Sequence, residues 1–170
     1  MINEILALKK NCEESQKNLL LLSGRAVKVC EEIIGICTER RNTFGDVRDE
    51  RSGREILDMC FSRVEKINSI SNEALDQVLT IYNSVMKYSE IGGSSTASFS
   101  TSYFFSAASE IGRAFEMLFE REIKAALNGI IDGLDLDGNG TNVNIHAVVS
   151  NAAKIAISVS KATKFYFEEG

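Results

Sequence analysis

One short stretch, residues 128–146, carries the residue types and spacing that come closest to a recognisable chemistry. Its first half matches the opening of a calcium-binding loop, in which oxygen ligands stand at alternate positions and a glycine provides the sharp turn. The matching residues are Asp135, Asp137, Asn139 and Gly140. The stretch therefore indicates a candidate metal site in which Asp135, Asp137 and Asn139 would be the ligands.

The second half of the calcium-loop pattern is missing. The eighth position should be a branched apolar residue and is Asn142, and the twelfth should be a bidentate glutamate and is His146. Without that carboxylate we expect only weak calcium binding, with a dissociation constant of roughly 1 mM. The interpretation that we favour is an ordinary turn, followed by Asn142 or Asn144 as the cap of the next helix.

His146 is the only histidine, so any nucleophile that needs an imidazole base has to use it. It lies at the beginning of an expected helix, beside Ile145. The residue three positions before it is Val143, which excludes the Glu-x-x-His pairs of di-iron helical bundles. We therefore expect His146 to be a helix-entry residue and expect the chain not to be an enzyme.

The four cysteines are the other chemically distinctive residues. Cys12, Cys30 and Cys37 are separated by whole helical turns, so they lie on nearly one stripe of a helix. If the chain reverses near residues 45–48, Cys60 comes opposite Cys30 or Cys37, and one disulfide among Cys30, Cys37 and Cys60 is geometrically reasonable. The alternative is that the cysteines are buried as small apolar side chains. No Cys-x-x-Cys pair exists, so zinc and thioredoxin-like redox sites are not expected.

Two heptad patterns predict the helices that carry these cysteines. Apolar residues recur in sevens over residues 5–36 and again over residues 57–88, and each pattern is interrupted by a single serine, Ser15 and Ser71. The polar stretch 38–54 separates the two patterns. The arrangement predicts an antiparallel helical hairpin with coiled-coil-like packing over residues 2–90.

A Gly/Ser/Thr-rich linker over residues 91–102 separates this hairpin from a second pair of helices, expected at 103–127 and 144–167. Gly24 and residues 69–72 are places where the first two helices could break, which would give five or six helices. No strand-like alternation of useful length is present. The prediction is an all-α antiparallel bundle of four long helices, built from two hairpins.

Composition bounds the class of protein. The 170 residues contain 44% hydrophobic and 25% charged residues and no proline, which suits one soluble helical domain covering residues 1–170. The formal net charge of -5 argues against a nucleic-acid partner, and no apolar run is long enough to span a membrane.

The compartment stays open. The first residues lack the pattern of a signal peptide, which favours the cytoplasm, but an extracellular protein whose signal had been removed would look the same. Only in a secreted chain would Asn139, in the triplet Asn139-Gly140-Thr141, be a glycosylation site.

Aromatic residues gather near both ends of the second hairpin, at 99–105 and 165–167. Three successive aromatics cannot all face one way, so some are expected to be exposed or to lie in an interface. We therefore expect a non-enzymatic structural or interaction module that acts through protein contacts, with self-association into a homo-oligomer. Two alternatives are a weak calcium-binding protein using the loop 135–146 and a carrier of a small apolar ligand in the bundle core. No cofactor is expected apart from weakly bound Ca²⁺.

Overall fold

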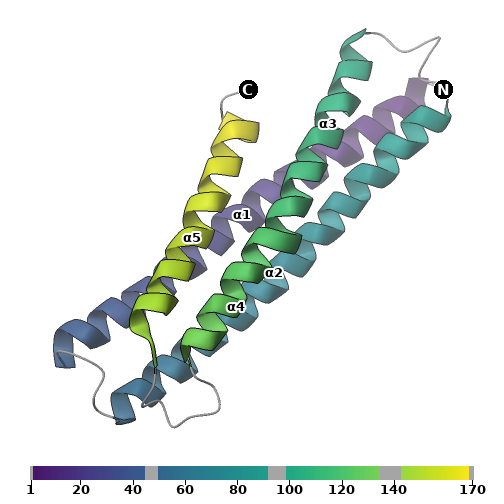
Figure 1. Cartoon of the computed structure of the whole chain (residues 1–170). Coiled ribbons are helices and arrows are strands. Elements are labelled where there is room, and N and C mark those ends of the chain that lie inside the picture. The colour runs from purple at the N-terminus through teal and green to yellow at the C-terminus, as the bar shows by residue number, and fades with distance from the viewer. Residues whose placement is uncertain (1, 45–49, 92–98, 135–142, 169–170) are drawn as a thin grey trace.

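The structure is a computed structural model that describes residues 2–44, 50–91, 99–134 and 143–168. In these residues the regular elements are helices that form an antiparallel bundle of two hairpins (Figure 1), which confirms the predicted fold class. The elements are α1 (Ile2–Phe44), α2 (Glu50–Glu90), α3 (Phe99–Met117), a π-helical turn (Leu118–Glu122), α4 (Ile123–Leu134), α5 (Ile145–Thr163) and a second π-helical turn (Lys164–Glu168).

The first hairpin consists of two uninterrupted helices. α1 is 43 residues long, which corresponds to about 65 Å at a rise of about 1.5 Å per residue, and α2 is 41 residues long. Gly24 and residues 69–72 lie inside these helices, so the alternative with five or six helices is wrong. Both helices also extend into the predicted connection at 38–54, of which residues 45–49 lie outside the described part of the chain.

α1 and α2 pack along the predicted heptad positions. The seam residues buried in α1 include Leu8, Cys12, Leu19, Leu22, Ala26, Val29 and Ile33, and those in α2 include Cys60, Val64, Ile67, Ala74, Val78, Ile81 and Tyr88. The two serines that interrupt the heptads are buried as well, and the hydroxyl of Ser71 donates to the carbonyl of Ile67 at 2.9 Å. A serine whose hydroxyl bonds within its own helix can occupy a core position, because its polar group has a partner there.

α3 begins at Phe99 rather than Tyr103, inside the predicted linker, because a tertiary contact extends the helix. The hydroxyl groups of Tyr88 and Ser102 are 2.9 Å apart, and the Tyr88 ring stacks on Phe105 with 4.1 Å between the ring centroids. These contacts with α2 outweigh the weak helical preference of the Ser- and Thr-rich sequence. The remaining linker residues 92–98 lie outside the described residues.

The helix that starts as α3 ends at Leu134 rather than Leu127, beyond two glycines. A Cβ at Gly129 would lie 2.5 Å from Nδ2 of Asn151, and one at Gly133 would lie 3.0 Å from Cγ2 of Val148. Both glycines therefore allow α5 to approach α4 closely. The packing that they permit compensates for the lower helical preference of glycine, which is about 1 kcal/mol per residue relative to alanine.

Gly24 and Gly35 of α1 provide a test of helix continuity. Both are exposed, and a Cβ at either position would meet no other atom within 4 Å. Gly24→Ala and Gly35→Ala should each raise the free energy of unfolding by about 0.5–1 kcal/mol, because alanine has the higher helical preference. Urea denaturation followed by circular dichroism measures the change. Gly112→Ala is the matched control, since its Cβ would lie 2.9 Å from Cε1 of Tyr82 and should lower stability. Destabilisation by Gly24→Ala would contradict an uninterrupted α1.

Candidate functional site

The predicted calcium ligands Asp135, Asp137 and Asn139 lie outside the described residues, as does the glycosylation triplet that begins at Asn139. The residues that flank them are described. The backbone N–H of Asn144 donates to the carbonyl of Gly133 at 2.7 Å, which joins the end of α4 to the start of α5. The corner between the two helices is therefore closed by a backbone hydrogen bond.

Asn144 caps α5, as predicted. Its backbone is extended, with φ of -91° and ψ of 91°, and its side-chain oxygen accepts from the N–H of Ala147 at 3.1 Å. This hydrogen bond satisfies one of the free N–H groups at the beginning of the helix.

His146 is exposed in the first turn of α5, where the sequence predicted a helix-entry residue. Within the described ranges, His, Cys, Asp and Glu side chains form no group of three or more that could hold a metal ion. In the same residues, no helix combines the length and the apolar character that crossing a membrane requires. Among the described residues, His146 therefore belongs to no such group.

The cysteines are placed largely as the sequence predicted. All four are buried with free thiols, and the sulfur atoms of Cys37 and Cys60 are 3.9 Å apart across the α1–α2 seam. Of the two partners considered for Cys60, the structure brings Cys37 and not Cys30 next to it. The two thiols form a hydrogen bond in which either sulfur can be the donor.

This contact separates the acidities of the two thiols. The hydrogen bond with Cys60 lowers the pKa of Cys37, although burial opposes the shift. The same hydrogen bond, together with burial, raises the pKa of Cys60. Burial raises the pKa of the isolated thiol of Cys30 to about 12, so Cys37 is the thiol of the described seam that ionises most readily.

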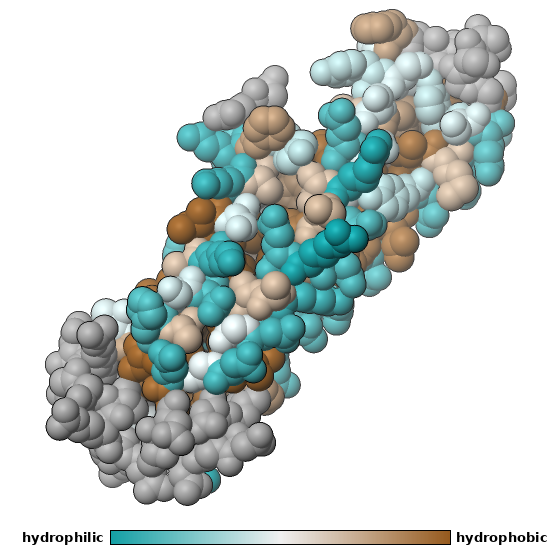
Figure 2. Space-filling model, viewed as in Figure 1, coloured by the Kyte–Doolittle hydropathy of each residue, from teal (hydrophilic) through white to brown (hydrophobic). Residues whose placement is uncertain are grey.

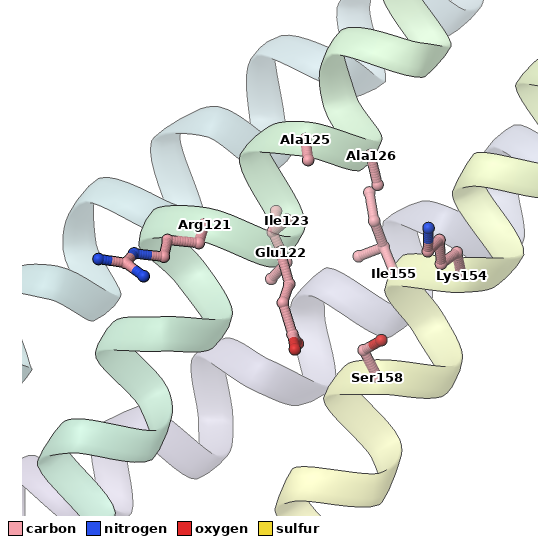
Figure 3. Close-up of a pocket in the computed structure, with 8 residues that line it drawn as sticks. All are labelled: Arg121, Glu122, Ile123, Ala125, Ala126, Lys154, Ile155 and Ser158. Carbon is pink, nitrogen blue, oxygen red and sulfur yellow. The ribbon is translucent and has the colours of Figure 1, made fainter.

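A groove of about 430 Å³ lies between α4 and α5, next to the first π-helical turn (Figure 3). The carboxylate of Glu122 points into the space between the helices, whereas Arg121 points away from it (Figure 3). Lys154 and Ser158 of α5 form part of the other wall. The lining residues bring charges of both signs together but include no histidine or cysteine, so no pair of the Ser–His or Cys–His type is formed there.

The aromatic residues near the ends of the second hairpin separate into core and surface. Phe105, Phe115 and Phe119 are among the largest fully buried side chains of the described residues and belong to the hydrophobic core. Of the three successive aromatics at 165–167, Phe165 is 65% exposed, which confirms that they cannot share one side.

The π-helical turn that follows α5 contacts α3 on one side and α1 on the other. Tyr166 and Phe167 pack on Phe115 of α3, with ring centroids 6.1 and 5.5 Å from it, and Glu168 lines one groove together with Leu20 of α1. α5, continued by the second π-helical turn, thus ends level with Phe115 and Leu20 in the described residues.

α1 and α3 both continue past this level. α3 begins at Phe99 and α1 at Ile2, so each helix extends about 16 to 18 residues, or about 25 Å, beyond the end of α5. At this end the bundle consists of α1, α2 and α3 (Figure 1), and Figure 2 shows a notch between the end of α5 and the start of α3.

The side of α1 that borders the notch follows from its heptads. Ser23 and Val27 line the groove that α1 forms with α5. Positions seven, fourteen and twenty-one residues earlier in the same two rows continue along the same side of the helix. We call the surface that α5 does not cover the step. It comprises the exposed residues Ile2, Leu6 and Glu13 and the half-buried Lys9 and Gln16 of α1, and the half-buried Phe104 of α3.

The step combines exposed apolar groups with a positioned charge. Ile2 and Leu6 are 74% and 56% exposed. Nζ of Lys9 lies 5.3 Å from the centroid of the Phe104 ring, so the half-buried lysine reaches from α1 to α3 in a cation–π contact. Sequence reasoning missed this surface, although the positions of Ile2 and Leu6, outside the α1–α2 heptads, are a signal that could have indicated it.

Comparison of the chain with protein-family models, with curated protein sequences and with solved structures found no match. The residues of this chain alone therefore have to indicate its function.

The cap at Asn144 can be tested by substitution. Asn144→Ala should lower the free energy of unfolding by about 1 kcal/mol, because the N–H of Ala147 loses its acceptor. Asn144→Asp keeps the acceptor and places a negative charge at the positive end of the helix dipole, so its stability should equal or exceed that of the wild type. Thermal denaturation compares the three proteins. Equal losses in both variants would show that the side-chain oxygen is not the stabilising group.

The cysteine contact can be tested by oxidation with glutathione disulfide. Cys37 and Cys60 should form a disulfide, giving up two protons and two electrons while one glutathione disulfide becomes two glutathione thiols. Peptide mapping by mass spectrometry without reduction should identify this bond. Cys37→Ser and Cys60→Ser should abolish it, and Cys30→Ser should leave it intact. A bond between Cys30 and Cys60 would contradict the observed register of α1 against α2.

Proposed function

We propose that this chain is a non-enzymatic helical interaction module that acts through protein–protein contacts at the step, and that it associates with itself there. The observation that carries the proposal is the unequal length of the helices. α1 keeps Ile2 and Leu6 on the side that faces α5 elsewhere, and within the described residues α5 and the π-helical turn after it reach only to about 25 Å from Ile2, so both side chains are exposed.

The apolar side chains at the step are suited to burial in an interface. Ile2 and Leu6 lie one helical turn apart, so a partner that contacts one also reaches the other. Complete burial of a leucine or isoleucine side chain contributes about 1.5–3 kcal/mol. Covering the two partly exposed side chains would contribute a similar amount in total, which supports a reversible contact rather than a permanent one.

The placement of reactive groups supports a role without catalysis. The thiols of Cys37 and Cys60 are reactive groups that lie side by side, and both are buried within the α1–α2 seam. His146 is exposed at the start of α5, on a different hairpin from the cysteines. A helical module whose thiols are buried and lie on a different hairpin from its histidine is well suited to presenting a surface to a partner.

Light scattering and sedimentation over a wide range of protein concentration test the proposal. The wild type should show an average mass that rises with concentration. The double substitution Ile2→Asp and Leu6→Asp should weaken the association about tenfold to a hundredfold, because it replaces the apolar contacts with charges. Leu79→Asp is the control, since Leu79 of α2 is 57% exposed and does not belong to the step. A wild type that stays monomeric at every concentration, or an equal effect of Leu79→Asp, would contradict the proposal.

A further inference from the structure

We infer that two copies of this chain pair through the N-terminal segments of α1, which lie antiparallel so that each occupies the space next to the step of the other. The inference rests on the proposed self-association and specifies its geometry. The step, together with Leu20 at its border, extends over residues 2–20 of α1, and the segment that would cover it in a second copy is the same stretch of α1.

The direction of the helices favours the antiparallel arrangement. α5 runs antiparallel to α1 (Figure 1), so an antiparallel α1 from a second copy runs in the direction of α5 and continues its path along the bundle. The N-terminal end of that helix then approaches the C-terminal end of α5. The two ends carry opposite partial charges of the helix dipole, so their approach is favourable.

The heptad rows of α1 define the register. The row that contains Ser23 continues backwards through Gln16, Lys9 and Ile2, and the row that contains Val27 continues through Leu20, Glu13 and Leu6. In antiparallel helices a residue of one row packs opposite a residue of the other row. A two-fold axis near Asn11 fulfils this condition over the whole step. The resulting pairs are Ile2 with Leu20, Leu6 with Gln16 and Lys9 with Glu13, each formed twice.

Charge complementarity selects this arrangement over a parallel one. In the antiparallel register Lys9 of each copy faces Glu13 of the other. In a parallel pair with equivalent residues opposite one another, Lys9 would face Lys9 and Glu13 would face Glu13, which is unfavourable. The contact between Lys9 and Phe104 holds the ammonium group at the step before a partner arrives, which reduces the entropy lost on pairing.

The dimensions of the step indicate a weak dimer. A surface about 25 Å long and about two helix diameters wide amounts to roughly 500 Å² per copy. Stable complexes bury about 800 Å² per partner, and weaker transient ones bury less. The pairing is therefore expected to be reversible. Because each surface contacts its own equivalent across a two-fold axis, it closes as a dimer and does not extend into a filament.

Charge reversal tests the register directly. Lys9→Glu places a second carboxylate opposite Glu13, and Glu13→Lys places a second ammonium group opposite Lys9. Each variant alone should therefore dimerise at least tenfold more weakly than the wild type.

An equal mixture of the two variants can form heterodimers. In a heterodimer each facing pair consists of one glutamate and one lysine, so no like charges meet. Heterodimers should form with an affinity within about threefold of the wild type. Sedimentation equilibrium of the separate and mixed variants measures these affinities, and native mass spectrometry identifies the heterodimer.

Matched controls lie one residue further along the helix. Lys10→Glu and Glu14→Lys make the same charge changes at the same spacing, at exposed positions outside the two rows, and should leave dimerisation unchanged. Helix content and melting temperature of each variant show whether it is folded. The mixture contains the same two variants, so any folding defect and the loss of the contact between Lys9 and Phe104 persist in it. Recovery of dimerisation in the mixture therefore reports the facing charges.

The outcomes separate this inference from the proposed function. If the wild type dimerises and the Ile2→Asp and Leu6→Asp substitutions prevent it, but the mixed charge variants form no heterodimer, the step is an interaction surface and the antiparallel register is overturned. If the wild type remains monomeric at all concentrations, self-association itself fails and the inference fails with it. Dimerisation that both substitution sets leave unchanged would place the interface elsewhere on the molecule and overturn both.

Discussion

The structure depends on the packing of α1 against α2. Their apolar residues repeat every seven positions over almost the whole length of each helix, so the contact between them continues without a gap. Because the heptad positions over residues 5–36 and 57–88 are apolar residues or small buried serines, the inner sides of the two helices pack together along this length. This continuity explains why Gly24 does not interrupt α1. The packing of its neighbours keeps the helix intact at a position where the local preference is weak.

The two helices of the second hairpin, α4 and α5, are joined closely at one end. Gly129 and Gly133 allow α5 to approach α4 closely, and the hydrogen bond from Asn144 to the carbonyl of Gly133 closes the corner between them. Since both helices of this hairpin are aligned at the corner, any difference in their lengths appears at the opposite end. That end lies next to the N-terminal segment of α1. The position of the step thus follows from the close contact between α4 and α5 at one end and from the unequal lengths of the described helices.

The parts of the fold that repeat along the sequence could be predicted, because periodicity reports which side of a helix is buried. Heptads over residues 5–36 and 57–88 predicted both long helices, and helical spacing predicted that Cys60 faces Cys30 or Cys37. The choice of Cys37 depends on the axial position of α2 against α1, which the pattern leaves open to within one or two turns. The limits of α3 and α4 depend on contacts with distant residues, namely Tyr88 at one end and Asn151 and Val148 at the other. Local propensities contain no information about such partners, so glycines and serines in this helix predicted ends that do not exist.

The composition of the step shows how an uncovered helix face can remain compatible with a folded monomer. Two of its α1 positions are apolar, and Lys9, Glu13 and Gln16 separate them from Leu20 in the same two rows. A face with apolar residues at all of these positions would form a continuous patch, which favours non-specific association. The interposed charges divide the patch, and in the proposed dimer they favour a partner whose own charges have the opposite order. In the proposed dimer an antiparallel copy of the same helix meets that condition, whereas an unrelated apolar surface would leave the charges of Lys9 and Glu13 without an oppositely charged group across the interface, which costs free energy. If the step is an interface as proposed, its polar residues lower the affinity for partners in general and raise the selectivity for one arrangement.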